Sequence, residues 1–237
     1  MWYERTELLL GAGNMERLRT SQAVVAGVGG VGACAAEMLV RAGVGRLVLI
    51  DNDEVGETNL NRQLPALQST LGRKKCSVLR ERLLDINPDL DILLIEDYIH
   101  EQNVAALLDP LQADVVVDAI DTLSPKIALI QYCLGRGLKL VSSMGAGAKL
   151  DATAIRIDDI SQTRECPLAH ALRKRLHRLG IQSGFQAIYS IEKPRRESVI
   201  LEESRNKKSQ VGTISYLPAA FGCACAQAAL TRLLDIP

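Results

Sequence analysis

One short stretch, residues 23–32 with the sequence AVVAGVGGVG, constrains this chain more than any other. Apolar residues run into a cluster of glycines, and an alanine-rich segment then continues to Gly43. This pattern predicts a buried strand, a tight turn and a helix. Gly27, Gly29 and Gly32 match G-x-G-x-x-G, where the missing Cβ atoms let a pyrophosphate approach the backbone N–H groups that open the helix. We therefore predict a nucleotide site at this turn.

A carboxylate stands where such a site needs one. A second apolar run, Leu47–Ile50, ends in Asp51, about 20 residues beyond the last glycine. A carboxylate at this place usually accepts hydrogen bonds from the ribose hydroxyls. Asp51 therefore strengthens the prediction of a nucleotide site, although it leaves open which nucleotide binds.

Strand-sized apolar runs alternate with helical segments as far as residue 143. The expected elements after Asp51 are a helix at 74–86, a strand at 91–95, a helix at 103–108, a strand at 115–121, a helix at 125–134 and a strand at 138–143. The alternation predicts an α/β fold with a doubly wound, Rossmann-like, mainly parallel sheet, whose ligands gather at the carboxyl ends of the strands. The glycine turn, Asp51 and Asp121 all fall at such ends.

Residues outside this alternation complete a single expected domain over 1–237. Residues 1–20 predict an amphipathic helix and a second short one, and residues 1–145 form the nucleotide-binding core. The C-terminal extension, 146–237, is expected to carry a basic helix, a β-like run at 154–157 and a last strand and helix from Val211. Its apolar run at 216–234 is interrupted by polar residues, which favours a buried or interface helix over a membrane span. No secretory leader opens the chain, so a cytoplasmic location is expected.

The 6 cysteines are scattered and include no C-x-x-C pair. This spacing disfavours a zinc ribbon, so no zinc is expected, and it suits reduced thiols in the cytosol. Cys34 and Cys133 lie in apolar helical patterns and are expected in the core. Cys166 precedes the basic helix, where it is either a thiol with a lowered pKa or an inert cysteine at the helix start.

Cations are concentrated in one part of the chain, although the net charge of the whole is zero. Residues 173–208 hold 10 Lys and Arg against 4 Asp and Glu, a net charge of +6, whereas residues 1–172 hold 17 against 23, a net charge of −6. The basic helix contributes Arg173, Lys174, Arg175 and Arg178, with Leu168, Leu172, Leu176 and Leu179 as its expected apolar stripe. Further clusters lie at 193–196 and 205–208. The clusters suit a polyanion, or else form a solvated face, and the 3% aromatic content favours phosphate contacts over base stacking.

The loop after Asp51 separates two kinds of nucleotide chemistry. A dehydrogenase needs little there beyond the ribose carboxylate. This loop instead offers amides and a guanidinium in Thr58–Gln63, with Lys74 and Lys75 soon after. Cations on a triphosphate, together with a later acid such as Asp121 to hold Mg²⁺, are what nucleotidyl transfer requires. The combination points away from NAD.

These residues resemble the ubiquitin-activating-enzyme-like adenylyltransferases, the superfamily that includes ThiF, MoeB and HesA. The resemblance rests on G-x-G-G-x-G with Gly27, Gly29, Gly30 and Gly32; on Asp51-x-Asp53; on Asn59-Leu-Asn-Arg62-Gln63; on Gly72-x-x-Lys75; and on Asp118-Ala-Ile-Asp121. Within the superfamily, the chain resembles most the branch of tRNA threonylcarbamoyladenosine dehydratases, over nearly its full length. Thr122 stands where the sulfur-carrier-activating branches usually have Asn.

The resemblance implies that ATP adenylates the carboxylate of threonylcarbamoyladenosine at position 37 of tRNA, after which an internal nitrogen displaces AMP and closes a ring. It implies that Asp51 binds the ribose, that Asn59, Arg62 and Lys75 bind the phosphates, and that Asp121 holds Mg²⁺. Asp53, Gln63 and Thr122 complete the expected nucleotide site.

Partners follow from the same resemblance. Arg5 stands where the superfamily's dimer partner supplies an arginine, so a homodimer is expected; otherwise Arg5 is a surface cation. Expected partners are tRNA and, as in some relatives, sulfur-transfer proteins. Two alternatives stay open: an adenylyltransferase for a ubiquitin-like sulfur-carrier protein, and a dinucleotide-binding module without chemistry.

Overall fold

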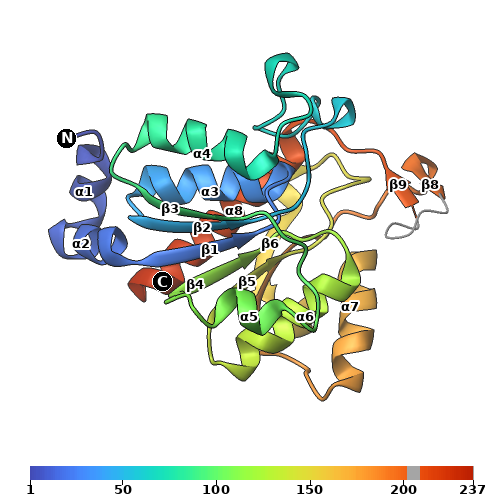
Figure 1. The fold of residues 1–237 in the computed structure, drawn as a ribbon. Coiled ribbons are helices and arrows are strands. Elements are labelled where there is room, and N and C mark those ends of the chain that lie inside the picture. The colour runs from blue at the N-terminus through green and yellow to red at the C-terminus, as the bar shows by residue number, and fades with distance from the viewer. Residues whose placement is uncertain (202–208, 237) are drawn as a thin grey trace.

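Seven strands form one sheet in the order β3-β2-β1-β4-β5-β7-β6 in a computed structural model that describes residues 1–201 and 209–236 (Figure 1). The strands are β1 Gln22–Ala26, β2 Arg46–Ile50, β3 Asp91–Ile95, β4 Val115–Asp118, β5 Lys139–Ser143, β6 Ile155–Asp159 and β7 Gln186–Ser190. All neighbouring pairs are parallel except β6 with β7. The prediction of a doubly wound, mainly parallel α/β sheet is confirmed.

Helices cover both faces of the sheet (Figure 1). They are α1 Glu4–Leu10, α2 Ala12–Thr20, α3 Gly30–Ala42, α4 Lys75–Ile86, α5 Val104–Leu108, α6 Leu123–Gly135, α7 Pro167–Arg178 and α8 Tyr216–Leu234. Val25 and Val117 face a core shared with α3, α4 and α8, while Val24 and Val116 face the core shared with α5, α6 and α7. Successive strand residues thus serve opposite cores, which explains why these strands are apolar throughout.

The chain reverses its direction of travel across the sheet between β1 and β4. From β1 it runs outward to β2 and β3, and then returns to β4, which pairs with the other side of β1. At such a switch point the connections after neighbouring strands leave toward opposite faces, which opens a crevice at the carboxyl ends. The glycine turn after β1 and residues 119–121 after β4 border this crevice.

The C-terminal third differs from the prediction in two places. Strand β7 was missed, because its sequence QAIYS has polar ends and lies in a polar surrounding, yet it is buried between β5 and β6. The strand expected from Val211 ends there instead: β9, Ser209–Val211, pairs with β8, Val199–Leu201, in a separate two-stranded ribbon. The cation cluster at 205–208 lies outside the described residues.

Helix α8 is the one helix in the described ranges that is long and apolar enough to cross a membrane. Most of its hydrophobic window is nevertheless buried, against α3 and the sheet. Where it crosses α3, a Cβ on Gly222 would lie 2.6 Å from the Cβ of Cys34, so only glycine permits this approach. The expectation of a buried helix agrees with this packing.

Candidate functional site

The glycine turn is packed directly onto the loop that follows β4. Gly27 has φ +85°, and a Cβ there would lie 2.9 Å from the carbonyl oxygen of Ala119. A Cβ on Gly32 would lie 1.8 Å from the oxygen of Gly27, so helix α3 can start this close to the turn only with glycine. The turn therefore leaves the backbone N–H groups at the start of α3 near the loop that leads to Asp121.

Asp51 holds the glycine turn in place. Its Oδ2 accepts a hydrogen bond from the backbone N–H of Val28 at 2.7 Å, and its Oδ1 accepts one from the N–H of Asp53 at 2.8 Å. The side chain is half-buried, at the carboxyl end of β2. Since each carboxylate oxygen has more than one lone pair, these contacts leave Asp51 capacity to accept hydrogen bonds from a ribose.

Arg62 is held within its own loop. One guanidinium nitrogen, Nη1, donates to the carbonyl of Thr58 at 2.7 Å and to Oδ1 of Asn61 at 2.8 Å. Asn59 accepts a hydrogen bond from the N–H of Gly56 at 3.1 Å through its Oδ1. These contacts order the loop without an ion pair to Arg62 among the described residues. An uncompensated guanidinium beside a nucleotide turn suits an anionic ligand.

Gln63 carries an orphaned polar atom beside the glycine turn. Its Oε1 is buried and has no hydrogen-bond partner in the described part of the chain. A Cβ on Gly29 would lie 3.6 Å from the Gln63 amide nitrogen, so the side-chain amide lies beside the N-cap of α3. Buried amide oxygens are nearly always paired. The residues of this turn therefore fit a bound nucleotide that supplies the missing partner.

Lys75 is buried, with 5% of its surface exposed, and pairs with Asp53. Its Nζ lies 2.8 Å from Asp53 Oδ2, and its backbone N–H donates to the Asp53 carbonyl at 3.1 Å. The charge of this lysine is thus already compensated, a pairing that the sequence pattern does not reveal. The ion pair connects the start of α4 to the loop that carries the nucleotide residues.

Asp121 is exposed and lies between Ala119, which the glycine turn packs against, and Thr122 at the N-cap position of α6. No cluster of three or more His, Cys, Asp or Glu suited to a metal is present in the described ranges. Mg²⁺ in nucleotide sites is commonly held by one or two carboxylates together with the substrate phosphates. An exposed carboxylate just beyond the carboxyl end of β4 is of the chemical type that such a site uses.

A second charged group at the end of β4 escaped the sequence analysis. Asp118 and Lys126 are both fully buried, and Lys126 Nζ lies 2.8 Å from Asp118 Oδ2. Ser142 Oγ also donates to this Oδ2, at 2.7 Å. The sequence signal for this pair is Lys126 itself, which lies within the apolar face of the expected helix at 125–134. A lysine is almost never fully buried unless it is paired with an acid.

Arg5 does not join these residues within one chain. It is exposed on α1, which precedes α2 at the amino ends of the strands (Figure 1), whereas the glycine turn lies at their carboxyl ends. Leu8 and Leu9 on the same helix are 82% and 83% exposed, so the expected amphipathic helix leaves apolar residues uncovered in the single chain.

Helix α7 presents only part of its expected cationic set. Lys174, Arg175 and Arg178 are exposed. Arg173 is half-buried and donates to the carbonyl of Thr163 at 2.7 Å, so it ties α7 to the preceding turn. The expected leucine stripe is wrong at one end: Leu179 follows the helix and is 49% exposed.

The cysteines lie mostly in the core. Cys34 and Cys133 are buried, as expected, and burial raises the pKa of Cys133 to about 12. Cys166 is also buried, at the N-cap of α7, with 5% of its surface exposed. This burial favours the inert reading of Cys166, because a reactive thiol needs access to its reaction partner.

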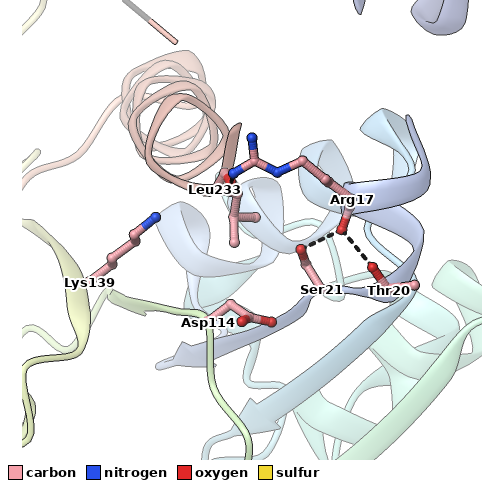
Figure 2. Close-up of a pocket in the computed structure, with 6 residues that line it drawn as sticks. All are labelled: Arg17, Thr20, Ser21, Asp114, Lys139 and Leu233. Carbon is pink, nitrogen blue, oxygen red and sulfur yellow. Dashed lines mark hydrogen bonds between the residues drawn. The ribbon is translucent and has the colours of Figure 1, made fainter. Parts of the chain in front are cut away.

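A cavity of about 300 Å³ lies at the opposite end of the sheet (Figure 2). It is lined by Arg17, Thr20, Ser21, Asp114, Lys139 and Leu233. Arg17 and Lys139 donate to carbonyls at the end of α8 and to Asp235, so their charges stabilise the C-terminus of that helix. None of the expected site residues lines this cavity.

Comparisons with known proteins agree with this geometry. The chain matches the ThiF family over residues 3–237. It is 40% identical to the tRNA threonylcarbamoyladenosine dehydratase of Bacillus subtilis over 228 residues, which cover 93% of this chain and 89% of that protein. Its structure is similar to that of Escherichia coli tRNA N6-threonylcarbamoyladenosine dehydratase in complex with ATP, with a TM-score of 0.90 and 33% identity over 98% of this chain and 93% of the other. The complex of the same E. coli protein with AMP gives a TM-score of 0.89 at 33% identity, over 98% and 94% of the two chains.

Proposed function

This chain belongs to the ThiF family, and from that premise we propose that it is an ATP-dependent dehydratase acting on N6-threonylcarbamoyladenosine in tRNA. The observation that carries the proposal is the agreement over nearly the whole length with proteins of that name, one of them crystallised with ATP and with AMP. The buried Oε1 of Gln63 beside the glycine turn supports the nucleotide part of the proposal, because this oxygen can accept a hydrogen bond from a ribose hydroxyl or a base amine.

The reaction has two steps. A carboxylate oxygen of the threonylcarbamoyl group attacks the α-phosphorus of ATP, and pyrophosphate leaves. A nitrogen of the same group then attacks the activated carbonyl carbon, loses its proton and expels AMP, which carries away the former carboxylate oxygen. The ring product is thus the substrate minus one water. Adenylation is needed because an oxide is a poor leaving group, whereas AMP is a good one.

The residues of the crevice suit the first step. Two anions, a carboxylate and a triphosphate, repel each other until cations and N–H groups neutralise the charge. We assign the ribose to Asp51, the phosphates to Asn59, Arg62, Lys75 and the glycine turn, and Mg²⁺ to Asp121. Bound Mg²⁺ would neutralise charge on the phosphates. For Lys75 this role requires that its pairing with Asp53 loosens or is shared when ATP binds.

We propose that the active form is a homodimer in which Arg5 of each protomer completes the site of the other. The exposed Leu8 and Leu9 support an α1 that a second protomer covers. Because α1 lies at the amino ends of the strands, away from the glycine turn, Arg5 is better placed to act in the partner's site than in its own. We propose that tRNA binds along α7. The side chains of Lys174, Arg175 and Arg178 are exposed there and can contact phosphates of the tRNA backbone.

Pyrophosphate release tests the proposal. The assay is run with ATP alone, with tRNA that carries threonylcarbamoyladenosine, and with a ubiquitin-like sulfur carrier. Release that depends on the modified tRNA, together with loss of one water from the nucleoside by mass spectrometry, supports the dehydratase. Release with the carrier alone would favour the carrier-activating alternative, and binding of NAD without any release would favour a module without chemistry.

A further inference from the structure

The end of β4 holds a buried ion pair that binds both backbone polar groups of a single residue, Ile120. Lys126 Nζ donates to the carbonyl of Ile120 at 3.0 Å and lies 2.8 Å from Asp118 Oδ2. Asp118 Oδ1 in turn accepts a hydrogen bond from the N–H of Ile120 at 3.1 Å. The two partners therefore bind the donor and the acceptor of the same residue, which directly precedes Asp121.

Neutral polar groups lie beside the pair. Both side chains are fully buried, and the neutral hydroxyl of Ser142 on β5 donates a hydrogen bond to Oδ2 of Asp118. The thiols of Cys133 and Cys225 lie nearby, and burial raises the pKa of each to about 12, so both stay neutral. Burial of two ions is costly, and an apolar pair of similar volume often stabilises a fold as well. A role other than stability is therefore the better explanation for this pair.

We propose that the Asp118–Lys126 pair positions Asp121 by fixing the backbone on both sides of Ile120, at the switch point of the sheet. The same loop also carries the Ala119 carbonyl, against which Gly27 packs, so the pair sets the loop relative to the glycine turn as well. Lys126 and Asp118 touch no substrate and are positioning residues. The inference rests on the proposed function in one respect only, the role of Asp121 in adenylation.

Three variants of the full chain test the inference: Lys126→Met, Asp118→Asn and the double variant. Lys126→Met leaves the Ile120 carbonyl without its donor and Asp118 without its counter-ion, so the melting temperature falls. We expect amide hydrogen exchange of residues 119–123 to rise at least about tenfold and kcat for pyrophosphate release to fall about 10–100-fold, the usual range for residues that orient a site. KM for ATP should change less than about threefold, because Asp51 and the glycine turn are untouched.

The double variant separates positioning from stability. It removes both charges, so most of the lost melting temperature should return. Since methionine cannot donate to the Ile120 carbonyl, exchange should stay fast and kcat low. Recovery of kcat together with the melting temperature, or unchanged exchange at 119–123 in Lys126→Met, would overturn the inference.

A control breaks an ion pair in which only the carboxylate is buried. Arg82→Met removes a partner of the buried Glu37 between α3 and α4, and it should lower the melting temperature while leaving exchange at 119–123 and kcat as in the wild type. Failure of the proposed function gives a different result, since the wild type then releases no pyrophosphate with modified tRNA. In that case hydrogen exchange at 119–123 in the three variants still decides whether the pair fixes the loop.

Discussion

The backbone N–H of Val28, in the middle of the glycine turn, donates to Asp51 Oδ2 at 2.7 Å. One carboxylate therefore shapes the turn that receives phosphates and stands where the ribose is expected. Asp51 thus connects the phosphate part and the ribose part of the expected site, so a substitution of Asp51 should disturb both parts.

Asp51→Ala should therefore weaken ATP binding by more than the loss of ribose contacts alone. The N–H groups of Val28 and Asp53 lose a charged acceptor, which costs about 1.5–3 kcal/mol for each hydrogen bond of this type. We expect ATP affinity to fall at least about 100-fold by calorimetry and the melting temperature to fall as well. Asp51→Asn, which keeps an acceptor, should lose less of both. Equal ATP affinity in Asp51→Ala and the wild type would remove this residue from the site.

Asp121→Ala should abolish pyrophosphate release and leave the fold intact. Asp121 is exposed at the carboxyl end of β4 and contributes little to the core, so the melting temperature should change by only a few degrees. The measurement is single-turnover pyrophosphate release with saturating ATP and modified tRNA, across a range of Mg²⁺ concentrations. A rate near that of the wild type would show that Asp121 takes no part in adenylation.

The sheet and the nucleotide turn were predictable because they depend on local patterns. Short apolar runs predicted β1, β2, β3, β4 and β5, and G-x-G-x-x-G located the turn. Strand β7 has no such pattern: its strand conformation depends on β5 and β6, which are distant in the sequence and pair with it along both edges. Periodicity over a short window cannot reveal such pairing.

The same limit applies to the charged residues of the site. The sequence predicts that Lys75 and Arg173 contact phosphates, but it does not reveal the partners that their long side chains reach within the chain. Lys75 pairs with Asp53, and Arg173 bonds to Thr163. The buried ion pair of Lys126 with Asp118 joins two residues eight positions apart through the tertiary fold. Motifs thus identify the residue types of a site. Which neighbours form ion pairs or hydrogen bonds with these residues depends on the packing of the folded chain.

Glu37 should make stability depend on pH. Burial alone would raise the pKa of this carboxyl, but hydrogen bonds and ion pairs with Arg82 and Arg41 outweigh it and lower the pKa below its usual value. A carboxyl with a lowered folded-state pKa stabilises the fold above its unfolded pKa of about 4.3, and this contribution is lost as pH falls through the folded value. Glu37→Gln should cost about 1–3 kcal/mol at pH 7 in urea unfolding, with a difference that shrinks below about pH 4. A constant difference between pH 3 and 7 would contradict the assignment.

The proposed role of Arg5 in trans can be tested by complementation. Arg5→Ala and Arg62→Ala chains should each be nearly inactive alone. A mixed dimer has one site with both arginines and one with neither, so a random one-to-one mixture should recover about a quarter of the wild-type activity. Native mass spectrometry confirms that mixed dimers form. Mixed dimers without recovered activity would show that Arg5 acts in its own subunit or not at all.

The surface of α7 should bind tRNA through phosphates. Replacing Lys174, Arg175 and Arg178 with Gln should weaken tRNA binding and lower the slope of log K against log salt by about 1 for each cation. Arg173 is left in place because it ties α7 to Thr163, so its loss would confuse a binding effect with a structural one.

A matched triple variant, Arg19→Gln with Arg46→Gln and Arg80→Gln, makes the same change in net charge at exposed positions away from α7. It should keep nearly the wild-type salt slope, because long-range charge is screened beyond about 8–10 Å in physiological salt. ATP affinity should be unchanged in both triples, and so should the melting temperature, since Leu172 and Leu176 still pack α7 against the core. If both triples lower the slope equally, tRNA responds to net charge alone, and the α7 cations are only a solvated face.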